Sequence, residues 1–205
     1  RMAAMAEILW SPKETRNWDD FSQRLEKQFK RYEAAGYNYS KSALLVSIAA
    51  VIDSPSQQFS ITMSKEISLG EIRYTMDGRV PTPTSPVYEQ PFVVNSTTTM
   101  KAATFSNGSL VSKITQQNFL FHKAIFQPVK LSFPYERYCN DATLTDGLRG
   151  SISFNDGKWQ GYHQQDFEAV IDLVTVDSIS KITTDFLQNT MSWIFFPVSV
   201  EFAVS

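Results

Sequence analysis

Residues 72–105 constrain the fold of this chain more than any other stretch. Apolar and polar residues alternate over 72–76, and the Asp-Gly pair at 77–78 then supplies the backbone freedom that a tight turn needs. A second alternating run, 98–105, ends in the turn-forming cluster 106–109. We therefore predict two β-hairpins in tandem, which on residue types alone indicate a small antiparallel sandwich of no particular function.

The composition indicates a folded protein and narrows its partners. A chain of 205 residues with 42% hydrophobic and 13% aromatic residues is long and apolar enough for one or two domains with cores. The net charge is −2 and the basic residues are scattered, so we expect no nucleic-acid or anionic-membrane partner. The single cysteine, Cys139, permits no internal disulfide, and we expect a small buried or half-buried side chain there instead of a reactive thiol.

The longest apolar run, 43–52, is too short to cross a bilayer, which takes about 20 residues in a helix. We therefore predict a strand in this run and no membrane span. The chain opens with Arg1 in the middle of a helical pattern, so we expect the natural N-terminus to lie upstream and draw nothing from the absence of a signal peptide.

The first 36 residues carry the signals of two helices. Asn17 is a capping residue with Asp20 three positions later, and Gly36 provides a C-terminal cap. A shorter helix is predicted over 2–9, stopped by the Ser-Pro pair at 11–12. The apolar residues of the longer helix share one face: Trp18, Phe21, Leu25, Phe29 and Tyr32.

Alternating runs continue on both sides of the two predicted hairpins. We expect the sandwich to begin with a strand at 59–64 and to end with one at 118–122. A new pattern starts after Pro128, and it predicts further strands at 129–133, 167–173, 179–182 and 198–204.

One segment of the predicted sandwich resembles a known family. Over residues 74–112 it reads YTMDGRVPTPTSPVYEQPFVVNSTTTMKAATFSNGSLVS. This is similar to the small β-sandwich that follows the barrel in chitobiase and β-N-acetylhexosaminidase, with a Tyr-Thr-x-Asp-Gly turn, a Pro-Thr-x-x-Ser-x-x-Tyr segment and a Lys-Ala-x-x-Phe strand. The resemblance implies an immunoglobulin-like fold for this part.

The N-terminal helices resemble the same family. The segment RMAAMAEILWSPKETRNWDDFSQRLEKQFKRYEAAG is similar to the closing helices of the (β/α)₈ barrel of family-20 glycoside hydrolases. That family works through an adjacent Asp-Glu pair, in which the Glu protonates the glycosidic oxygen and the Asp orients the attacking acetamido group of the substrate. This chain has no Asp-Glu dipeptide, so no catalytic residue is expected in it, and Glu7 and Trp10 are expected to serve helix packing and surface charge.

A third, C-terminal resemblance is to the discoidin-like jelly roll, also called the coagulation factor type C or galactose-binding-like fold. It rests on a Thr-Asp-Gly turn at 145–147, on Trp159, and on an Ile-Asp-Leu strand at 171–173, although Val174 replaces the usual glycine. The fold class implied is mainly β with an N-terminal helical segment. We expect four parts: 1–38, the terminal helices of a truncated barrel; 39–58, a linker with a strand; 59–125, an immunoglobulin-like β-sandwich; and 126–205, an incomplete discoidin-like jelly roll.

The site candidates all lie in the C-terminal part. Tyr162, His163 and Trp193 lie beside turns, where aromatic and polar side chains bind sugars, so they are candidates for carbohydrate binding, with burial in the core as the alternative. Candidate oxygen ligands of a structural Ca²⁺ are Asp141, Asp146 and Asp156, with Asn140, but turn formation explains the same residues. No other cofactor is expected. His122 lacks a second ligand at metal-binding spacing and is expected to be structural.

Three interpretations of the function remain open. In the first, the chain is a non-catalytic C-terminal region, structural or glycan-binding, of a periplasmic or extracellular β-N-acetylhexosaminidase, with the catalytic barrel of the parent chain as its partner. In the second, it is a carbohydrate-binding or adhesion protein that reuses the same modules. In the third, it is a purely structural spacer, which a glycan array would distinguish from the second. Without a barrel to cover it, the apolar helix face is expected either to fold back on the sandwich or to cause non-physiological self-association, which unpaired edges at 198–204 would assist.

Overall fold

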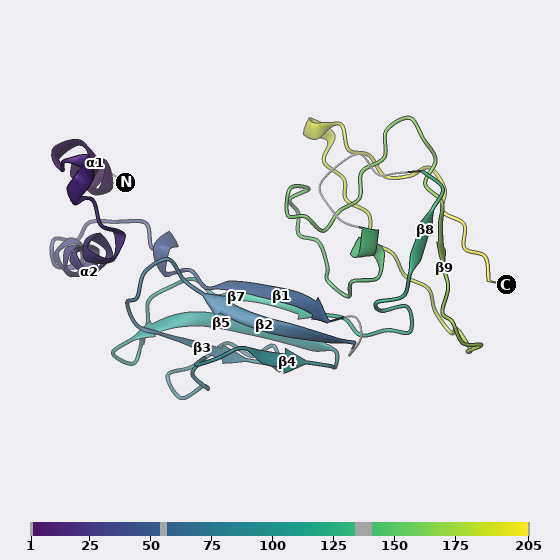
Figure 1. Ribbon diagram of the computed structural model, residues 1–205, viewed down its shortest axis with the longest axis horizontal. Helices are drawn as coiled ribbons and strands as arrows, with labels where there is room; N and C mark the ends of the chain where they lie inside the picture. The colour runs from purple at the N-terminus through teal and green to yellow at the C-terminus, as the bar shows by residue number, and fades with distance from the viewer. Residues whose placement is uncertain (1, 54–56, 134–140, 205) are drawn as a thin grey trace. The chain divides into compact units, whose positions relative to one another are not determined.

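The computed structural model describes residues 2–53, 57–133 and 141–204. The chain divides into two compact units (Figure 1): the first comprises Arg1–Asp53 and Gln58–Asn118, and the second Ser54–Gln57 and Phe119–Ser205. The protein is mainly β, with several antiparallel sheets after a short N-terminal helical segment, as predicted. Within the described residues, none of the helices has the length and apolarity that a membrane crossing requires.

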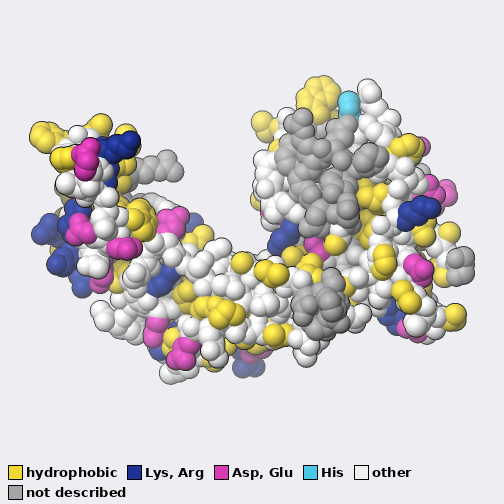
Figure 2. Space-filling model, in the orientation of Figure 1, with side chains coloured by type: hydrophobic (Ala, Val, Ile, Leu, Met, Phe, Trp, Pro, Cys, Tyr) yellow, Lys and Arg dark blue, Asp and Glu magenta, His cyan; other side chains and the backbone are white. Residues whose placement is uncertain are grey.

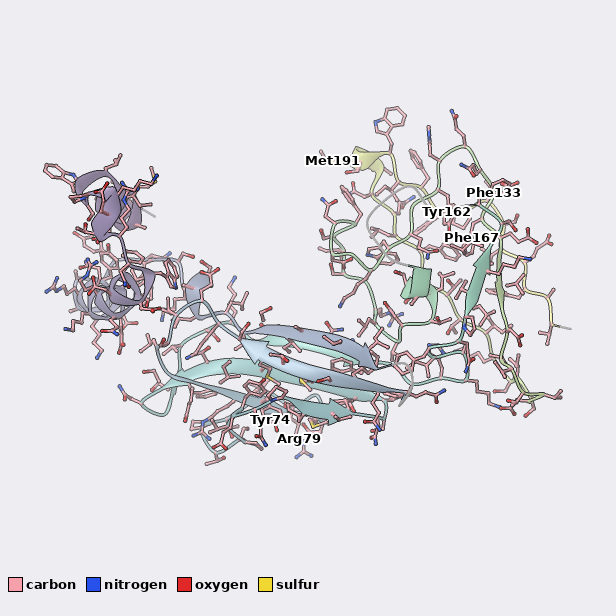
Figure 3. All side chains as sticks on the ribbon, in the orientation of Figure 1. Tyr74, Arg79, Phe133, Tyr162, Phe167 and Met191 are labelled. Atoms are coloured by element: carbon pink, nitrogen blue, oxygen red, sulfur yellow. The ribbon has the colours of Figure 1, made fainter. Side chains whose placement is uncertain are left out.

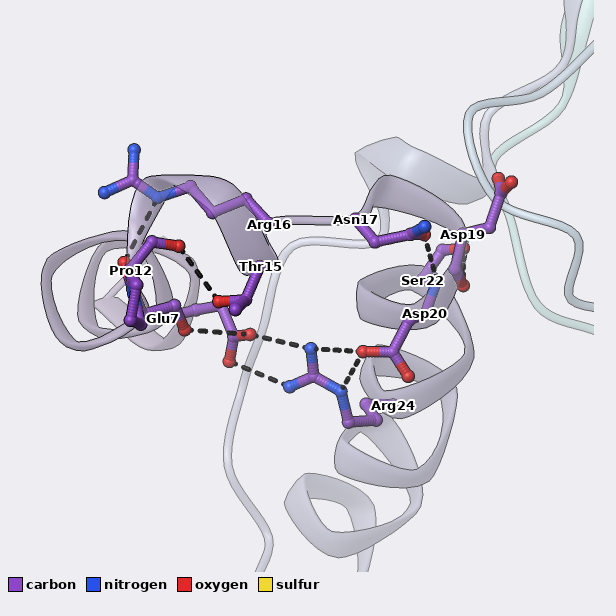
Figure 4. Close-up of polar contacts among 10 residues, drawn as sticks. Glu7, Pro12, Thr15, Arg16, Asn17, Asp19, Asp20, Ser22 and Arg24 are labelled. Atoms are coloured by element: carbon purple, nitrogen blue, oxygen red, sulfur yellow. Dashed lines mark hydrogen bonds and ion pairs between the residues drawn. The ribbon is translucent and has the colours of Figure 1, made fainter.

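The helical segment begins and ends where the sequence predicts. Helix α1 (Met2–Trp10) is followed by a short 3₁₀ turn, η1 (Lys13–Thr15), and by the longer helix α2 (Trp18–Ala34). The side chain of Asn17 caps α2 by accepting a hydrogen bond from the Asp20 amide at 3.0 Å (Figure 4). This bond satisfies an amide that the first turn of a helix leaves without an intrahelical partner.

The C-terminal end of α2 forms a Schellman motif. The amide of Tyr37 donates to the carbonyl of Tyr32, and the amide of Gly36 donates to that of Glu33. Gly36 has a φ of +70°, the left-handed conformation that this motif needs and that glycine adopts without strain. The predicted glycine cap is therefore confirmed, and it reverses the chain toward the sandwich.

The apolar face of α2 packs against the loops of the sandwich. Phe29 is buried with Leu44 and Ile67, and the ring of Tyr39 stacks on that of Phe29 at a centroid distance of 4.6 Å. Leu25 and Tyr32 pack around the same cluster. Of the two expected fates of this face, the structure shows the first: the helix folds back within its own unit.

The sandwich consists of two antiparallel sheets. The first has the strand order β1-β2-β4, with β1 at Ser47–Asp53, β2 at Gln58–Ser64 and β4 at Phe92–Val94. The second has the order β3-β5-β6, and β7 also pairs with β5. Its strands are β3 (Glu71–Thr75), β5 (Thr98–Ser106), β6 (Ser109–Leu110) and β7 (Thr115–Phe119).

The core of the sandwich comes from the two central strands. In β2, the alternate residues Phe59, Ile61 and Met63 are buried, as a strand with one face on a core requires. In β5, Met100 and Ala102 are fully buried. Burial of a large side chain such as Phe59 contributes roughly 1.5–3 kcal/mol, so these strands supply much of the stability of the unit.

The strand pairing corrects the expectation of two hairpins in tandem. β3 pairs with β5, while the intervening β4 pairs with β2 in the other sheet. The first turn does contain a left-handed glycine, Gly78, whose amide donates to the Thr99 carbonyl at 2.8 Å. The second hairpin, β5–β6, is confirmed: Asn107 and Gly108 both have positive φ, as a type I′ turn requires.

The borders of the sandwich can be compared with the expectations. The segment 39–58, expected as a linker with a strand, contains the 3₁₀ turn η2 (Ser42–Leu44) and a strand, β1, which is paired along its whole length with β2. The last strand of the sandwich, β7, ends at Phe119, earlier than the predicted 118–122.

The second unit contains little regular structure among its described residues. One antiparallel pair is formed by β8 (Val129–Leu131) and β9 (Ala169–Ile171), with two 3₁₀ turns, η3 (Asp141–Leu144) and η4 (Thr190–Ser192). The strands predicted at 179–182 and 198–204 are not formed. Alternating residues form a strand only where a neighbouring strand can pair with them. The discoidin-like jelly roll stays a prediction.

Ion pairs tie the irregular C-terminal segment of the second unit to its earlier part. Lys123 bridges to Asp177 at 2.7 Å and also donates to the Ser178 carbonyl. Arg149 makes a bidentate pair with Asp185, with both distances at 2.7 Å. Exposed pairs of this kind contribute at most about 1 kcal/mol each, so this segment is held weakly compared with the sandwich.

The glycine at position 70 allows a test of the packing between β3 and β5. Gly70 has a φ of +71°, and an added Cβ would lie 2.3 Å from the Phe105 carbonyl oxygen. Gly70→Ala should therefore lower the free energy of unfolding of the first unit by roughly 2–4 kcal/mol, from strain and steric overlap together. Urea denaturation followed by circular dichroism measures this loss.

Gly36→Ala is the matched control, because Gly36 has nearly the same φ but no atom within 4 Å of an added Cβ. We expect a loss of only about 1 kcal/mol there. Equal losses in the two variants would show that the approach of Gly70 to Phe105 does not matter.

Candidate functional site

Tyr162 and His163, two of the three predicted sugar-binding residues, lie on an irregular loop of the second unit. The Tyr162 hydroxyl contacts the Gln160 side-chain oxygen at 3.0 Å, and its ring lies 5.0 Å from that of Phe167. The side chain of Tyr162 is half-buried, whereas His163 is exposed. Figure 3 shows Tyr162 with Phe167 beside β8. Tyr162 therefore combines the packing expected of a core residue with partial access to solvent.

Trp193, the third predicted residue, projects from a tight loop at 189–194. The main chains of Asn189 and Ile194 exchange two hydrogen bonds of 3.0 Å, and the Asn189 side chain accepts one from the Ser192 amide. Trp193 has a φ of +58° and is 84% exposed. Because a left-handed backbone is unfavourable for a bulky residue, the closed loop must hold it in place.

This loop presents more apolar surface than the sequence indicates. Met191 at the loop tip is 94% exposed, and Figure 3 shows it on this loop, which carries η4. The ring contact of Trp193 is with Phe195, while that of Tyr162 is with Phe167. Tyr162 and Trp193 thus belong to two different aromatic pairs. Met191 was missed because an isolated methionine in a polar stretch carries no periodic signal.

The predicted calcium ligands that can be described serve turns. The Asp146 carboxylate accepts a hydrogen bond from the Leu148 amide at 2.8 Å, and the Asp156 carboxylate accepts one from the Lys158 amide at 2.9 Å. Each is an Asx turn, which was the alternative explanation. The side chain of Asp141, together with Asn140 and Cys139, lies outside the described residues. Among the residues described, no three His, Cys, Asp or Glu side chains are grouped as metal ligands.

Asp146 is the most strongly perturbed acid of these candidates. The residue is 4% exposed, and this burial raises the pKa of its carboxyl from 3.8 to about 6, against the opposing effects of the Leu148 amide and the Lys158 charge. A carboxyl with this pKa is partly protonated near neutral pH. Asp146 is therefore a buried turn residue whose carboxyl has a pKa of about 6. Among the described residues, we identify no catalytic group beside it.

An unpaired apolar surface lies on α1. Arg24 of α2 holds α1 through a bidentate contact with Glu7, at 2.7 and 2.9 Å, and also contacts Asp20 (Figure 4). On the rest of α1 the large apolar side chains are exposed, and Figure 2 shows hydrophobic atoms over this part of the first unit. We call this set the α1 face: Met2, Met5, Ile8, Leu9 and Trp10.

A shallow cleft of about 510 Å³ lies between α2 and the β5–β6 turn. Its charged side chains are already in ion pairs: Glu26 with Lys30, and Glu71 with Arg73. Next to it, the ammonium group of Lys65 donates to the carbonyls of three consecutive residues, 68–70, and burial lowers its pKa. The cleft is therefore best described as a packing boundary between α2 and the sandwich.

Comparison with known proteins connects the sandwich to one family. Residues 61–119 match the family described as Fn3 associated. This match runs from β2 to the end of β7 and covers less than a third of the 205-residue chain. No curated protein matches the chain.

The raised pKa of Asp146 predicts how the second unit responds to pH. Its carboxyl binds a proton more readily in the folded than in the unfolded state, so its contribution is complete below about pH 4 and is lost as pH rises through about 6. The second unit should lose about 1–3 kcal/mol of stability between pH 4 and 7 from this group. Thermal denaturation across this range measures the slope.

Asp146→Asn should remove that part of the slope, because the amide oxygen can still accept the Leu148 hydrogen bond but does not titrate. The control is Asp156→Asn, which changes a half-exposed Asx-turn carboxylate in the same unit. A slope that survives in Asp146→Asn would assign the pH dependence to other groups.

Proposed function

We propose that this chain is a non-catalytic accessory region of a carbohydrate-active enzyme, and that the enzyme is a β-N-acetylhexosaminidase. Such an enzyme removes terminal N-acetylhexosamine residues by substrate-assisted catalysis. The observation that carries the proposal is the Fn3-associated match at 61–119. It covers most of the sandwich and includes the segment 74–112, which resembles the domain that follows the barrel in these enzymes.

The N-terminal helices support the same proposal. A helix as short as α1, with nine residues, is below the roughly 12–15 residues at which isolated helices become stable in water. Its only described polar anchor to α2 is exposed and contributes little. We propose that the α1 face docks on the catalytic barrel, as the closing helices of a family-20 barrel do. Several large apolar side chains would be buried there, at about 25 cal/mol per Å².

The chain itself would not carry out the reaction. The catalytic Asp-Glu pair that the resemblance implies is absent from the sequence. In the second unit, the carboxylates of Asp146 and Asp156, which were candidate calcium ligands, accept the hydrogen bonds of Asx turns. The catalytic residues would belong to the barrel, and the whole enzyme would act in the periplasm or outside the cell, where the resembling enzymes meet their substrates.

The experiment compares the isolated chain with the same chain joined to its barrel. The isolated chain should not release nitrophenol from aryl N-acetylglucosaminides above background. In the joined protein, Leu9→Glu should lower the melting temperature by several degrees, because it places a charge in the docked α1 face. In the isolated chain it should change little, because Leu9 is exposed there.

Gln23→Glu, which adds the same charge at an exposed position of α2, serves as the control. If Leu9→Glu leaves the joined protein unchanged, the docking proposal is wrong. If the region encoded upstream of Arg1 contains no barrel with an Asp-Glu pair, the assignment to a hexosaminidase is wrong.

A second candidate function, carbohydrate binding or adhesion, is favoured by the Trp193 loop. An exposed indole on a loop closed by main-chain hydrogen bonds can stack on the apolar face of a sugar ring at a reduced ordering cost. Calorimetry with N-acetylglucosamine and galactose oligomers should then show binding that falls at least tenfold in Trp193→Ala. Met191→Ala, on the same loop, should bind within about twofold of the parent, and no heat from any oligomer would end this candidate.

A further inference from the structure

β1 is the longest unprotected strand edge of the sandwich. It lies at the end of the β1-β2-β4 sheet and pairs with β2 at every position from Ser47 to Asp53. Within the described part of the chain, the main chain of residues 47–52 makes no hydrogen bond outside this ladder. Because alternate residues of an antiparallel strand direct their N–H and C=O groups away from the partner, the outer edge of β1 offers a row of free donors and acceptors.

The other strands at the sheet borders are protected in ways that β1 is not. Residues 86–88 cover β3, where the Tyr74 amide donates to the Pro86 carbonyl and the Tyr88 amide to the Ile72 carbonyl. β4 has three residues and follows Pro91, and β6 has two. β7 is polar, with the sequence Thr-Gln-Gln-Asn-Phe.

The sequence of β1 contains none of the usual protective residues. It reads Ser-Ile-Ala-Ala-Val-Ile-Asp, with no proline, no lysine and one charge, at its end. Natural proteins block exposed edges with such residues because an open edge recruits other strands. Val51, on the outer face of the strand, is 66% exposed. An edge that is this long and apolar, with a single charge at its end, is expected to have a partner.

The sequence of β1 is also complementary to itself. If two copies pair antiparallel about a twofold axis at Ala50, Ile48 meets Ile52 and Ala49 meets Val51. The charged Asp53 then faces Ser47, so no like charges are opposed. The half-buried isoleucines extend the core side of the sheet across the axis, and small alanines lie at its centre, where two backbones approach each other.

We propose that two copies of this chain associate through β1, in antiparallel register about Ala50, to form a continuous six-stranded sheet of order β4-β2-β1-β1-β2-β4. Such a twofold interface is closed, so it forms dimers and not open chains. The contact is the width of one strand, which places it among small, transient interfaces that bury less than about 1,200 Å². Association should therefore be reversible and dependent on concentration.

Sedimentation equilibrium tests the association. The average mass should rise with concentration from the monomer value of 23.3 kDa toward twice that value. Val51→Lys should shift the midpoint to at least tenfold higher concentration, because it replaces an apolar cross-strand contact by two charges near the axis. The control is Thr62→Lys: Thr62 pairs with Ala49 and is exposed on the same face, but it lies one strand in from the edge.

Cross-linking tests the register. In a Cys139→Ser background, which removes the single native cysteine, Ala50→Cys places two thiols directly opposite each other across the axis. The Cα atoms of opposed residues lie about 4.5–5.5 Å apart, within the range that a disulfide needs. Ala49→Cys places the two equivalent Cα atoms about 8 Å apart, too far for a disulfide. Ala50→Cys should therefore form covalent dimers at least tenfold faster.

Three results would overturn the proposal. One is a monomer mass at every concentration up to about 1 mM, which would leave the edge open or assign it to a strand of another protein. The second is an equal shift of the midpoint in Val51→Lys and Thr62→Lys. The third is equal cross-linking of Ala49→Cys and Ala50→Cys, which would exclude the register about Ala50.

Discussion

The burial of β5 is the constraint on which the rest of the first unit depends. β5 pairs with β3, β6 and β7, and its residues Ala102, Ala103, Thr104 and Phe105 are all buried. A strand that is buried on consecutive residues is covered on both faces, so each polar group must find a partner within the protein. Thr104 does so: its hydroxyl donates to the Leu44 carbonyl at 2.6 Å, and its amide donates to the Ser112 hydroxyl at 2.9 Å. These bonds fix the segments before β1 and after β6 against the same strand.

Features set by a few neighbouring residues could be predicted from the sequence, and those set by distant partners could not. The Asn17 cap, the Gly36 ending of α2 and the Asn107-Gly108 turn all appear as predicted, because each follows from the conformations of adjacent residues. The pairing of β3 with β5 was not predicted, because alternation identifies a strand but not the strand beside it. For the same reason, the strands predicted at 179–182 and 198–204 in the second unit are not formed.

The candidate site shows the same division. The two described aspartates were recognised as turn residues or ligands, and the structure places both in Asx turns, because Asp and Asn bind the amide two positions later with no help from the fold. The exposure of Trp193 depends on the closed loop at 189–194, and the unprotected edge of β1 depends on the order of the sheet. Neither has a local sequence signal. The sequence thus identified residues able to bind ligands or form turns, whereas the fold determined which side chains and strand edges are exposed to solvent.

The Lys65 ammonium group does in this sandwich what a bound cation does in other loops. It gathers the carbonyl oxygens of residues 68–70, just before β3, where Gly70 passes close to Phe105. A metal ion in that position would exchange with solvent and could be removed by a chelator, whereas an ammonium group is covalently attached to the chain. The start of β3 is therefore held by a positive charge that belongs to the chain itself.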